Sequence, residues 1–203
     1  MFVPDLYKNE NQLEIEQFIH KNGFSILVNQ TNGTLWATHI PLVLEIKNDK
    51  QFLVGHVSKL NPQAESFKSN EEVLAIFSGI NAYISSSWYD HENVPTWNYL
   101  AVHDYGKVRL HSHEEALEAL KRLLNKYEIN SQNPIRIENL SEKTMRETRG
   151  IVSFEIEISA IESVKKLSQN RDDKNYKNII NELEKTNEIQ AIAVAKAMKE
   201  NRP

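Results

Sequence analysis

Two segments of the sequence gather side chains that can bind an anion or the polar edge of a ring. Residues 37–41 end an otherwise apolar run with Thr38 and His39. Residues 55–62 supply a second set, made of His56, Ser58, Lys59 and Asn61. Hydroxyl, imidazole, ammonium and amide groups are the donors from which phosphate sites are built. The alternative is a structural role, because lone histidines more often satisfy hydrogen bonds in a core than bind a ligand.

A third segment is rich in aromatic residues. Two tryptophans and three tyrosines fall within residues 83–99, in a chain that is 8% aromatic. Such clusters suit a protein interface or a ring-stacking pocket, because tyrosine and tryptophan combine a large apolar surface with a polar group. A corner of the core with satisfied indole donors fits the same pattern equally well.

A fourth segment, residues 165–171, joins the last predicted strand to the last helices. Ser168 or Asn170 is expected to cap the next helix, because Asp172 and Asp173 would then fall in its first turn. The cations of this segment, Lys165, Lys166 and Arg171, also suit an anion at the helix start.

Length and composition limit the classes of protein to which the chain can belong. The 203 residues carry 24 basic and 28 acidic side chains, for a formal net charge of −4. This length predicts one domain over residues 1–203, with a helical extension from about residue 172. The absence of cysteine excludes disulfides, zinc–thiolate sites and thiol nucleophiles. Without a secretory signal or a long apolar run, a cytoplasmic protein with no membrane span is expected.

No catalytic or metal motif stands out. His111 and His113, with His103, could suggest a metal site. His113 lies just inside a capped helix start, however, and no third ligand has a typical spacing, so no metal site is predicted. The phosphate loop, the nucleophile elbow and the dinucleotide fingerprint are all absent from the sequence. No catalytic residue is assigned, and enzyme activity stays open.

The elements that position the polar segments are mostly strands. A helix is expected at residues 11–22, and Asn32-Gly33 predicts a hairpin between two strands that flank it. Strands at 42–46 and 51–57 are expected to pair across a turn at 48–50, which would bring the two polar segments together. Four further strands are expected at residues 73–78, 81–85, 97–102 and 106–110, with a break at Gly79 and a hairpin between the last two.

In the second half of the chain, apolar residues recur with the spacing of a helix. Ser112 and Glu115 form a capping box before an amphipathic helix, and residues 141–149 predict a short polar helix. Apolar and polar residues alternate over residues 151–158, which predicts a strand with one solvent-exposed face. The chain is expected to end in helices. The fold class is therefore mainly antiparallel β with peripheral helices, either α+β or a β-barrel with helical additions.

Five segments taken in order resemble the PaiB family. They are residues 37–41 (Ala-Thr-His-Ile-Pro), 55–62 (Gly-His-Val-x-Lys-x-Asn-Pro), 82–89 (Ala-Tyr-Ile-Ser-x-Ser-Trp-Tyr), 94–99 (Val-Pro-Thr-Trp-Asn-Tyr) and 166–171 (Lys-Leu-Ser-Gln-Asn-Arg). The opening Met-Phe-x-Pro is similar to the start of the family as well. The resemblance runs from Met1 to about Leu183. One departure is Ser86, where the family usually has proline.

The resemblance implies an FMN-binding split β-barrel, related in fold to pyridoxamine-phosphate oxidases, that forms a homodimer with FMN at the dimer interface. The implied cofactor site uses Thr38, His39, His56, Ser58, Lys59 and Asn61, with Ser168 and Gln169 closing it. Lys59 is expected to hold the phosphate and Thr38 to give a hydroxyl contact. The family is described as negative transcriptional regulators.

Three functions remain after this comparison. The first is a flavin-binding regulator that acts through a ligand or partner. The second is a flavin-dependent oxidoreductase of unknown substrate, and the third and weaker is a haem-binding split barrel. Direct DNA binding is implied by the family but not favoured by the negative charge or by any helix-turn-helix pattern. It would need a basic surface such as Lys143, Arg146 and Arg149, which is equally well explained as a solvated helix face.

Overall fold

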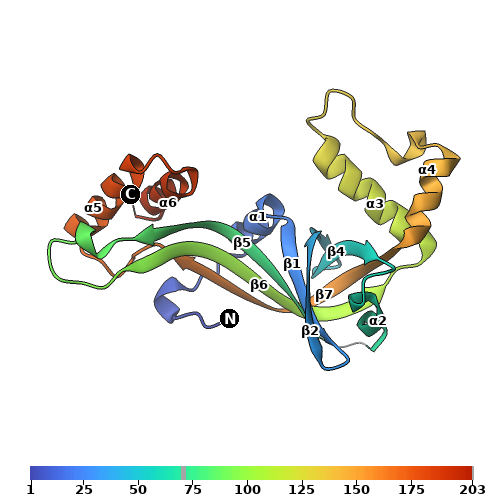
Figure 1. Ribbon diagram of the computed structural model, residues 1–203, viewed down its shortest axis with the longest axis horizontal. Coiled ribbons are helices and arrows are strands. Elements are labelled where there is room, and N and C mark those ends of the chain that lie inside the picture. The colour runs from blue at the N-terminus through green and yellow to red at the C-terminus, as the bar shows by residue number, and fades with distance from the viewer. Residues whose placement is uncertain (70–71, 203) are drawn as a thin grey trace. The chain divides into compact units, whose positions relative to one another are not determined.

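The computed structural model describes residues 1–69 and 72–202, without the side chain of Ser69. Its contacts divide the chain into two compact units. Unit 1 comprises Met1–Phe18, Phe77–His103 and Glu162–Pro203, and unit 2 comprises Ile19–Ile76 and Asp104–Ile161. Within the described residues, seven strands form one sheet in the order β2-β1-β5-β6-β7-β4-β3 (Figure 1).

The helices and strands of the described residues have the following bounds. The strands are β1 (Phe24–Thr31), β2 (Thr34–Pro41), β3 (Val43–Lys47), β4 (Lys50–Ser58), β5 (Glu72–Ile84), β6 (Thr96–Leu110) and β7 (Ile151–Lys166). The α-helices are α1 (Gln12–Lys21), α2 (Gln63–Ser66), α3 (His113–Glu128), α4 (Glu142–Glu147), α5 (Asp173–Lys185) and α6 (Ile189–Asn201). Thus β5, β6 and β7 contribute residues to both units.

Several local predictions are confirmed. β1 and β2 pair antiparallel across Asn32 and Gly33, whose φ angles of 52° and 78° are those of a tight hairpin turn. β3 pairs antiparallel with β4, as predicted for the strands around residues 48–50. Ser112 and Glu115 make the predicted capping box at the start of α3.

Two predicted interruptions are wrong, because β5 and β6 each run unbroken. Gly79 and Gly106 lie inside these strands and give room to packed neighbours. A Cβ atom on Gly79 would lie 2.5 Å from the ring of Phe18, and one on Gly106 would collide with the carbonyl of Glu157. The glycines therefore serve close packing rather than chain reversal, so the expected break and the expected hairpin do not form.

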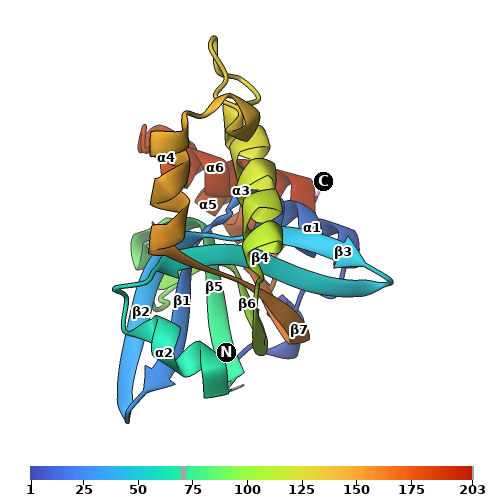
Figure 2. The same ribbon diagram turned by 90° about the vertical axis from the view of Figure 1, so that its right-hand side faces the viewer.

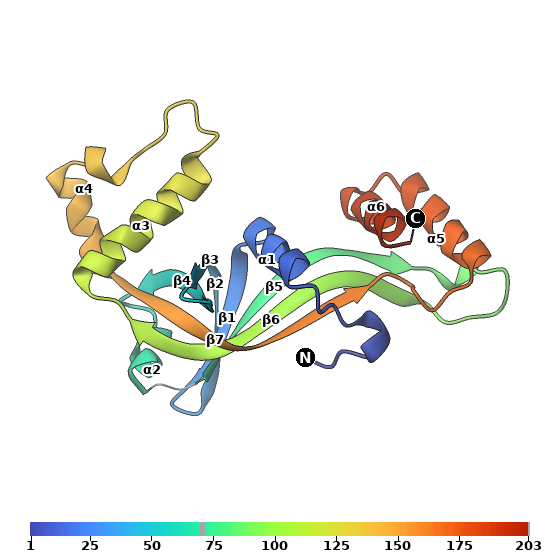
Figure 3. The same ribbon diagram turned by 180° about the vertical axis from the view of Figure 1, so that it is seen from behind.

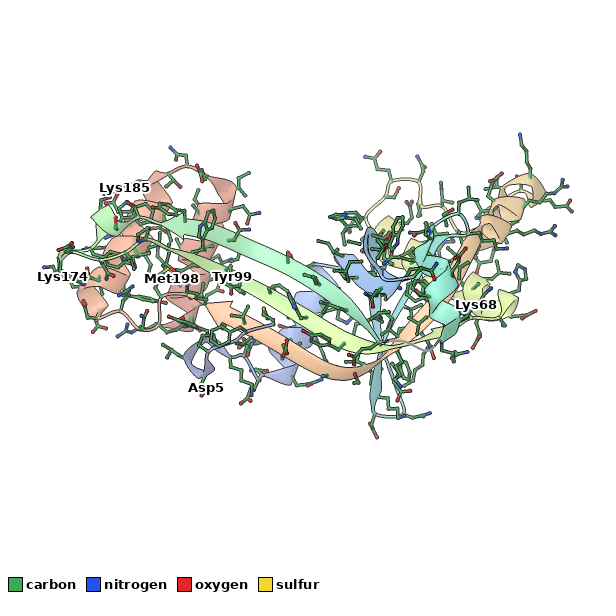
Figure 4. All side chains as sticks on the ribbon, turned by 60° about the horizontal axis from the view of Figure 1, so that its bottom comes forward. Asp5, Lys68, Tyr99, Lys174, Lys185 and Met198 are labelled. Atoms are coloured by element: carbon green, nitrogen blue, oxygen red, sulfur yellow. The ribbon has the colours of Figure 1, made fainter. Side chains whose placement is uncertain are left out.

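Unit 1 has a core in which α5 and α6 cover apolar residues of β5 (Figure 1). Met198 of α6, which is labelled in Figure 4, is fully buried. Asn98 Nδ2 of β6 donates to the Met198 sulfur at 3.4 Å. The buried members of this core are Ala82, Ile84, Tyr89, Leu167, Tyr176, Ile179, Ile180, Leu183, Ala191, Val194, Ala195 and Met198. The predicted cap of α5 is wrong, because Asp172 rather than Ser168 or Asn170 accepts from the Asn175 N–H, at 2.9 Å.

Candidate functional site

Thr38 and Asn61, from the two polar segments, meet in unit 2 as predicted. Asn61 Nδ2 donates to Thr38 Oγ1 at 2.8 Å, and Thr38 Oγ1 in turn donates to Gln63 Oε1. The backbone N–H of Gln63 donates to Asn61 Oδ1 at 3.0 Å. The strands therefore bring the hydroxyl and the amide together, and the third member of the group is a glutamine of α2.

Gln63 is the centre of this network and is 0% exposed. Its Nε2 donates to the Leu27 carbonyl at 3.1 Å and to Asn29 Oδ1 at 2.8 Å, both on β1. Buried amides that are fully paired fix a structure locally, because leaving one unpaired is costly. The network thus fastens the chain after β4 to the β1–β2 hairpin, and it commits the Thr38 hydroxyl proton to Gln63.

The other predicted residues of these two segments differ in exposure. His39 is exposed, with its ring 6.1 Å from that of Phe24. His56 is half-buried, and burial lowers its pKa. Ser58 is exposed, and its hydroxyl accepts from the Leu60 N–H at 3.2 Å.

The glycine that precedes His56 has a packing explanation. A Cβ on Gly55 would lie 2.5 Å from the Leu42 side chain and 3.3 Å from the Pro41 carbonyl. The close approach that the glycine permits is therefore to the chain itself.

Lys59 lines a pocket of about 400 Å³ in unit 2. The pocket lies where β4 and β6 end and β7 begins, and Figures 2 and 3 show α3, which follows β6, standing beside α4, which precedes β7. Pairing of β4 with β7 explains the placement, because it sets Ser58 opposite Ile151. The polar lining consists mainly of Lys59, His111, Ser112, His113, Thr148 and Arg149.

His111, in the wall of this pocket, belongs to a buried polar cluster. Its Nδ1 shares a hydrogen bond of 2.9 Å with Ser153 Oγ, and its Nε2 lies 3.6 Å from Glu155 Oε2. Burial lowers the pKa of His111 and outweighs the opposite effect of Glu155. Burial also opposes ionisation of Glu155, but hydrogen bonds from Arg109 and Lys47 outweigh it and lower the pKa of that carboxyl.

Ser168 and Gln169 lie in unit 1, where both make internal hydrogen bonds. Ser168 is buried with a left-handed φ of 61°, and its hydroxyl donates to Asn98 Oδ1 at 3.0 Å. Gln169 Oε1 accepts from the Leu167 N–H at 2.7 Å. Their role at a cofactor stays a prediction.

The aromatic segment of unit 1 divides into two parts. Tyr89 is buried in the core, with the Arg171 guanidinium 4.7 Å from its ring centre, and Trp88 packs against the same core. Tyr83 and Trp97 are 48% and 52% exposed and form an edge-to-face pair with ring centres 5.9 Å apart. Core and surface roles therefore both occur, and the exposed pair is available for contact with a partner.

One buried carboxyl belongs to neither polar group. Asp104 on β6 is 1% exposed, and neither of its oxygens has a hydrogen-bond partner among the described residues. Burial raises its pKa to about 7. Sequence reasoning missed it, since an aspartate within a strand gives no sign of its burial.

Sequence reasoning also missed His113 and Arg149 as neighbours of Lys59, interpreting them as a helix start and a solvated face. Because both residues lie far from Lys59 in the sequence, no local pattern indicates that the three are neighbours. In the described parts of the chain, residues 1–69 and 72–202, no three His, Asp or Glu side chains gather as metal ligands. Over the same residues, no helix is long and apolar enough to cross a membrane.

Several solved structures share the fold. Two of them are the FAD and heme binding protein from Mycobacterium smegmatis (TM-score 0.63, 12% identity, 84% of this chain and 78% of that chain) and the flavocytochrome Anf3 from Azotobacter vinelandii (TM-score 0.63, 14% identity, 84% and 75%). At such identities the likeness shows the fold alone. It confirms the predicted split β-barrel with peripheral helices, here with β2 and β3 as edge strands of the sheet.

Sequence comparison gives the family. Residues 1–160 match the family described as "Putative FMN-binding domain". The chain is also 41% identical over 201 residues to "Protease synthase and sporulation protein PAI 2" of Bacillus subtilis (strain 168), which covers 98% of this chain and 97% of that protein. The family match covers most of this chain, and the Bacillus subtilis relative aligns with nearly all of it. The chain therefore belongs to the PaiB family of FMN-binding-domain proteins.

Proposed function

We propose that the protein binds FMN as a homodimer and acts as a PaiB-type negative regulator of transcription, through a ligand or partner rather than through strong DNA binding of its own. The observation that carries the proposal is the Lys59 pocket, because all of its lining residues fall within the family match over residues 1–160. The Bacillus subtilis relative, named for protease synthesis and sporulation, supports the regulatory part.

The residues of the pocket fit a flavin phosphate. A phosphate monoester is an anion that takes charge-assisted hydrogen bonds, and Lys59 and Arg149 offer an ammonium and a guanidinium. The volume of about 400 Å³ lies within the range of small-molecule sites. FMN, when bound, would supply hydride and electron transfer, while the protein groups bind and orient it.

The Gln63 network has a supporting role in this proposal. It fixes Asn61, two residues after Lys59, to Thr38 on β2. The Lys59 N–H donates to the Gly150 carbonyl at 2.9 Å and holds the same loop to the chain before β7. Lys59 is therefore held from both sides, which reduces the entropy that its backbone would lose on binding a phosphate.

For the homodimer, the supporting feature is the exposed pair Tyr83 and Trp97. Aromatic residues are enriched in the centres of interfaces, and closed two-fold dimers are the commonest assembly. Binding of FMN at the interface between two protomers is part of the proposal.

A flavin-dependent oxidoreductase is the second candidate. The observation in its favour is the hydrogen-bonded pair of His111 and Ser153 in the pocket wall, because such a pair can hold and pass a proton.

Visible absorption of the purified protein after addition of FMN and gel filtration tests the cofactor. A retained flavin band is the expected result; a Soret band after haem addition, with no flavin retained, would favour the haem-binding alternative. An electrophoretic mobility shift at physiological salt, with and without FMN, then tests regulation. Tight sequence-selective binding by the protein alone would contradict the proposed indirect action.

A further inference from the structure

We propose that Arg149 and His113 join Lys59 as the phosphate-binding residues of the flavin site, and that this trio makes the site select FMN over riboflavin. The inference rests on the proposed flavin function and names two residues that the sequence motifs do not include.

The charge of the pocket lining is the first observation. The residues that line it include the cations Lys59 and Arg149 and no aspartate or glutamate. Acidic residues outnumber basic ones in the whole chain, 28 to 24, so this lining departs from the average composition. A concave surface lined by one sign of charge concentrates ligands of the other sign.

The donors that remain available are the second observation. Thr148 Oγ1 donates to the Met145 carbonyl at 2.7 Å, and Ser112 Oγ donates to Glu114 at 3.0 Å. His111 is bound to Ser153. In the part of the chain that the structure describes, the side chains of Lys59, His113 and Arg149 make no hydrogen bond or ion pair, and His113 interacts with Glu114 only through its charge. These three side chains are therefore the donors left for a ligand.

The third observation is that two carboxylates near His111 are already paired with a cation. Arg109 forms ion pairs with Glu115 at 2.8 Å and with Glu155 at 2.9 Å, so both carboxylates are compensated. Glu114 does not line the pocket, although its carboxylate interacts with the charge of His113, and Glu142 shares only the adjoining hollow. Among the described residues, neither Lys59 nor Arg149 forms an ion pair with a carboxylate, so both charges stay available to an anion.

The three donors come from three different elements. Lys59 follows β4, His113 begins α3, and Arg149 lies in the 3₁₀ turn Thr148–Gly150. The bond of 2.9 Å from the Lys59 N–H to the Gly150 carbonyl sets Lys59 beside the residue that follows Arg149. Donors that converge from separate elements can surround a phosphate rather than touch one side of it.

An adjoining hollow of about 350 Å³ supplies a matched control. It shares His113, Thr148 and Arg149 with the Lys59 pocket and adds Arg146 and Glu142. Arg146 is exposed like Arg149 and lies three residues before it, but it does not line the Lys59 pocket. Its hollow also contains a carboxylate, which disfavours an anion.

The test measures dissociation constants of FMN and riboflavin by flavin fluorescence, for the full-length parent, Arg149→Gln, Lys59→Gln and Arg146→Gln. Loss of a charge-assisted phosphate contact should weaken FMN about 10- to 150-fold in the first two variants. Riboflavin should bind the parent and all three variants alike, and Arg146→Gln should leave FMN unchanged. Inorganic phosphate should compete with FMN in the parent and less in Arg149→Gln. Arg149→Lys, which keeps a point charge, should recover part of the loss.

The outcomes separate the two proposals. If the parent binds neither flavin, the proposed function is refuted, and the inference with it. If the parent binds FMN and Arg149→Gln binds it equally tightly, the phosphate assignment is refuted while the function stands. Equal losses of FMN and riboflavin in a variant that unfolds at the parent's temperature would also refute the assignment, because the phosphate would then not be the group recognised.

Discussion

Asp104 should make the protein less stable as the pH rises toward neutrality, and Asp104→Asn should remove that dependence. The carboxyl is buried, and neither oxygen has a partner among the described residues. Because burial raises its pKa in the folded state, the native protein holds a proton that the unfolded chain has already released. The stability contributed by the protonated group is complete below the unfolded pKa and is lost as the pH rises through the folded one.

The magnitude follows from the two pKa values. The pKa rises from 3.8 to about 7, and at about 1.4 kcal/mol per pH unit the free energy of unfolding falls by roughly 4 kcal/mol. Asparagine has nearly the shape of the neutral carboxyl and would be equally unpaired. The two proteins should therefore be similarly stable near pH 4, and the variant should be more stable by roughly 4 kcal/mol near pH 8.

Urea unfolding followed by tryptophan fluorescence at several pH values measures this difference. Glu118→Gln, which removes an exposed carboxylate of α3, serves as the control and should change stability little and equally at each pH. If the stability difference between Asp104→Asn and the parent stays constant from about pH 4 to about pH 8, the argument from an unpaired buried carboxyl is wrong.

Three further changes test the packing and the assembly. Thr38→Val removes the hydroxyl that donates to buried Gln63 and should lower the free energy of unfolding by about 1–3 kcal/mol in urea; no loss would show that the network is not needed. Gly55→Ala should cost about 1–3 kcal/mol in the same assay, because its Cβ would lie 2.5 Å from Leu42, and a neutral result would contradict that contact. Trp97→Ser should weaken the proposed dimer at least about 10-fold by light scattering as a function of concentration, whereas an unaltered dimer would place the interface elsewhere.

Local chemistry made part of the fold predictable. Asn32 and Gly33 accept positive φ, and the capping box of Ser112 and Glu115 satisfies helix donors within four residues. Gly79 and Gly106 were misjudged because their partners, Phe18 and Glu157, lie about fifty or more residues away along the chain. A glycine that ends a strand and one that admits a neighbour look the same in a sequence.

The candidate site was predictable to a similar extent. The pairing predicted for the strands at 42–46 and 51–57 was expected to bring the two polar segments together, and Thr38 and Asn61 do meet. Gln63 was not foreseen, since the direction in which a short helix turns its amide depends on packing. The neighbours of Lys59 in its pocket come from the start of α3 and from the chain before β7, and only the pairing of β4 with β7 brings them there.

The interleaving of the two units affects how the chain folds during synthesis. Unit 2 ends at Ile161, so a ribosome has made all of it before α5 and α6 are translated. Ala82 and Ile84 of β5 share their core with Val194 and Met198, more than a hundred residues later. Until the last helices emerge, the apolar side chains at this end of β5 stay exposed to solvent. Strands that are transiently exposed in this way are prone to aggregate or to pair incorrectly. The C-terminal helices therefore complete the fold last, and a nascent chain stopped before them would be a natural substrate for chaperones.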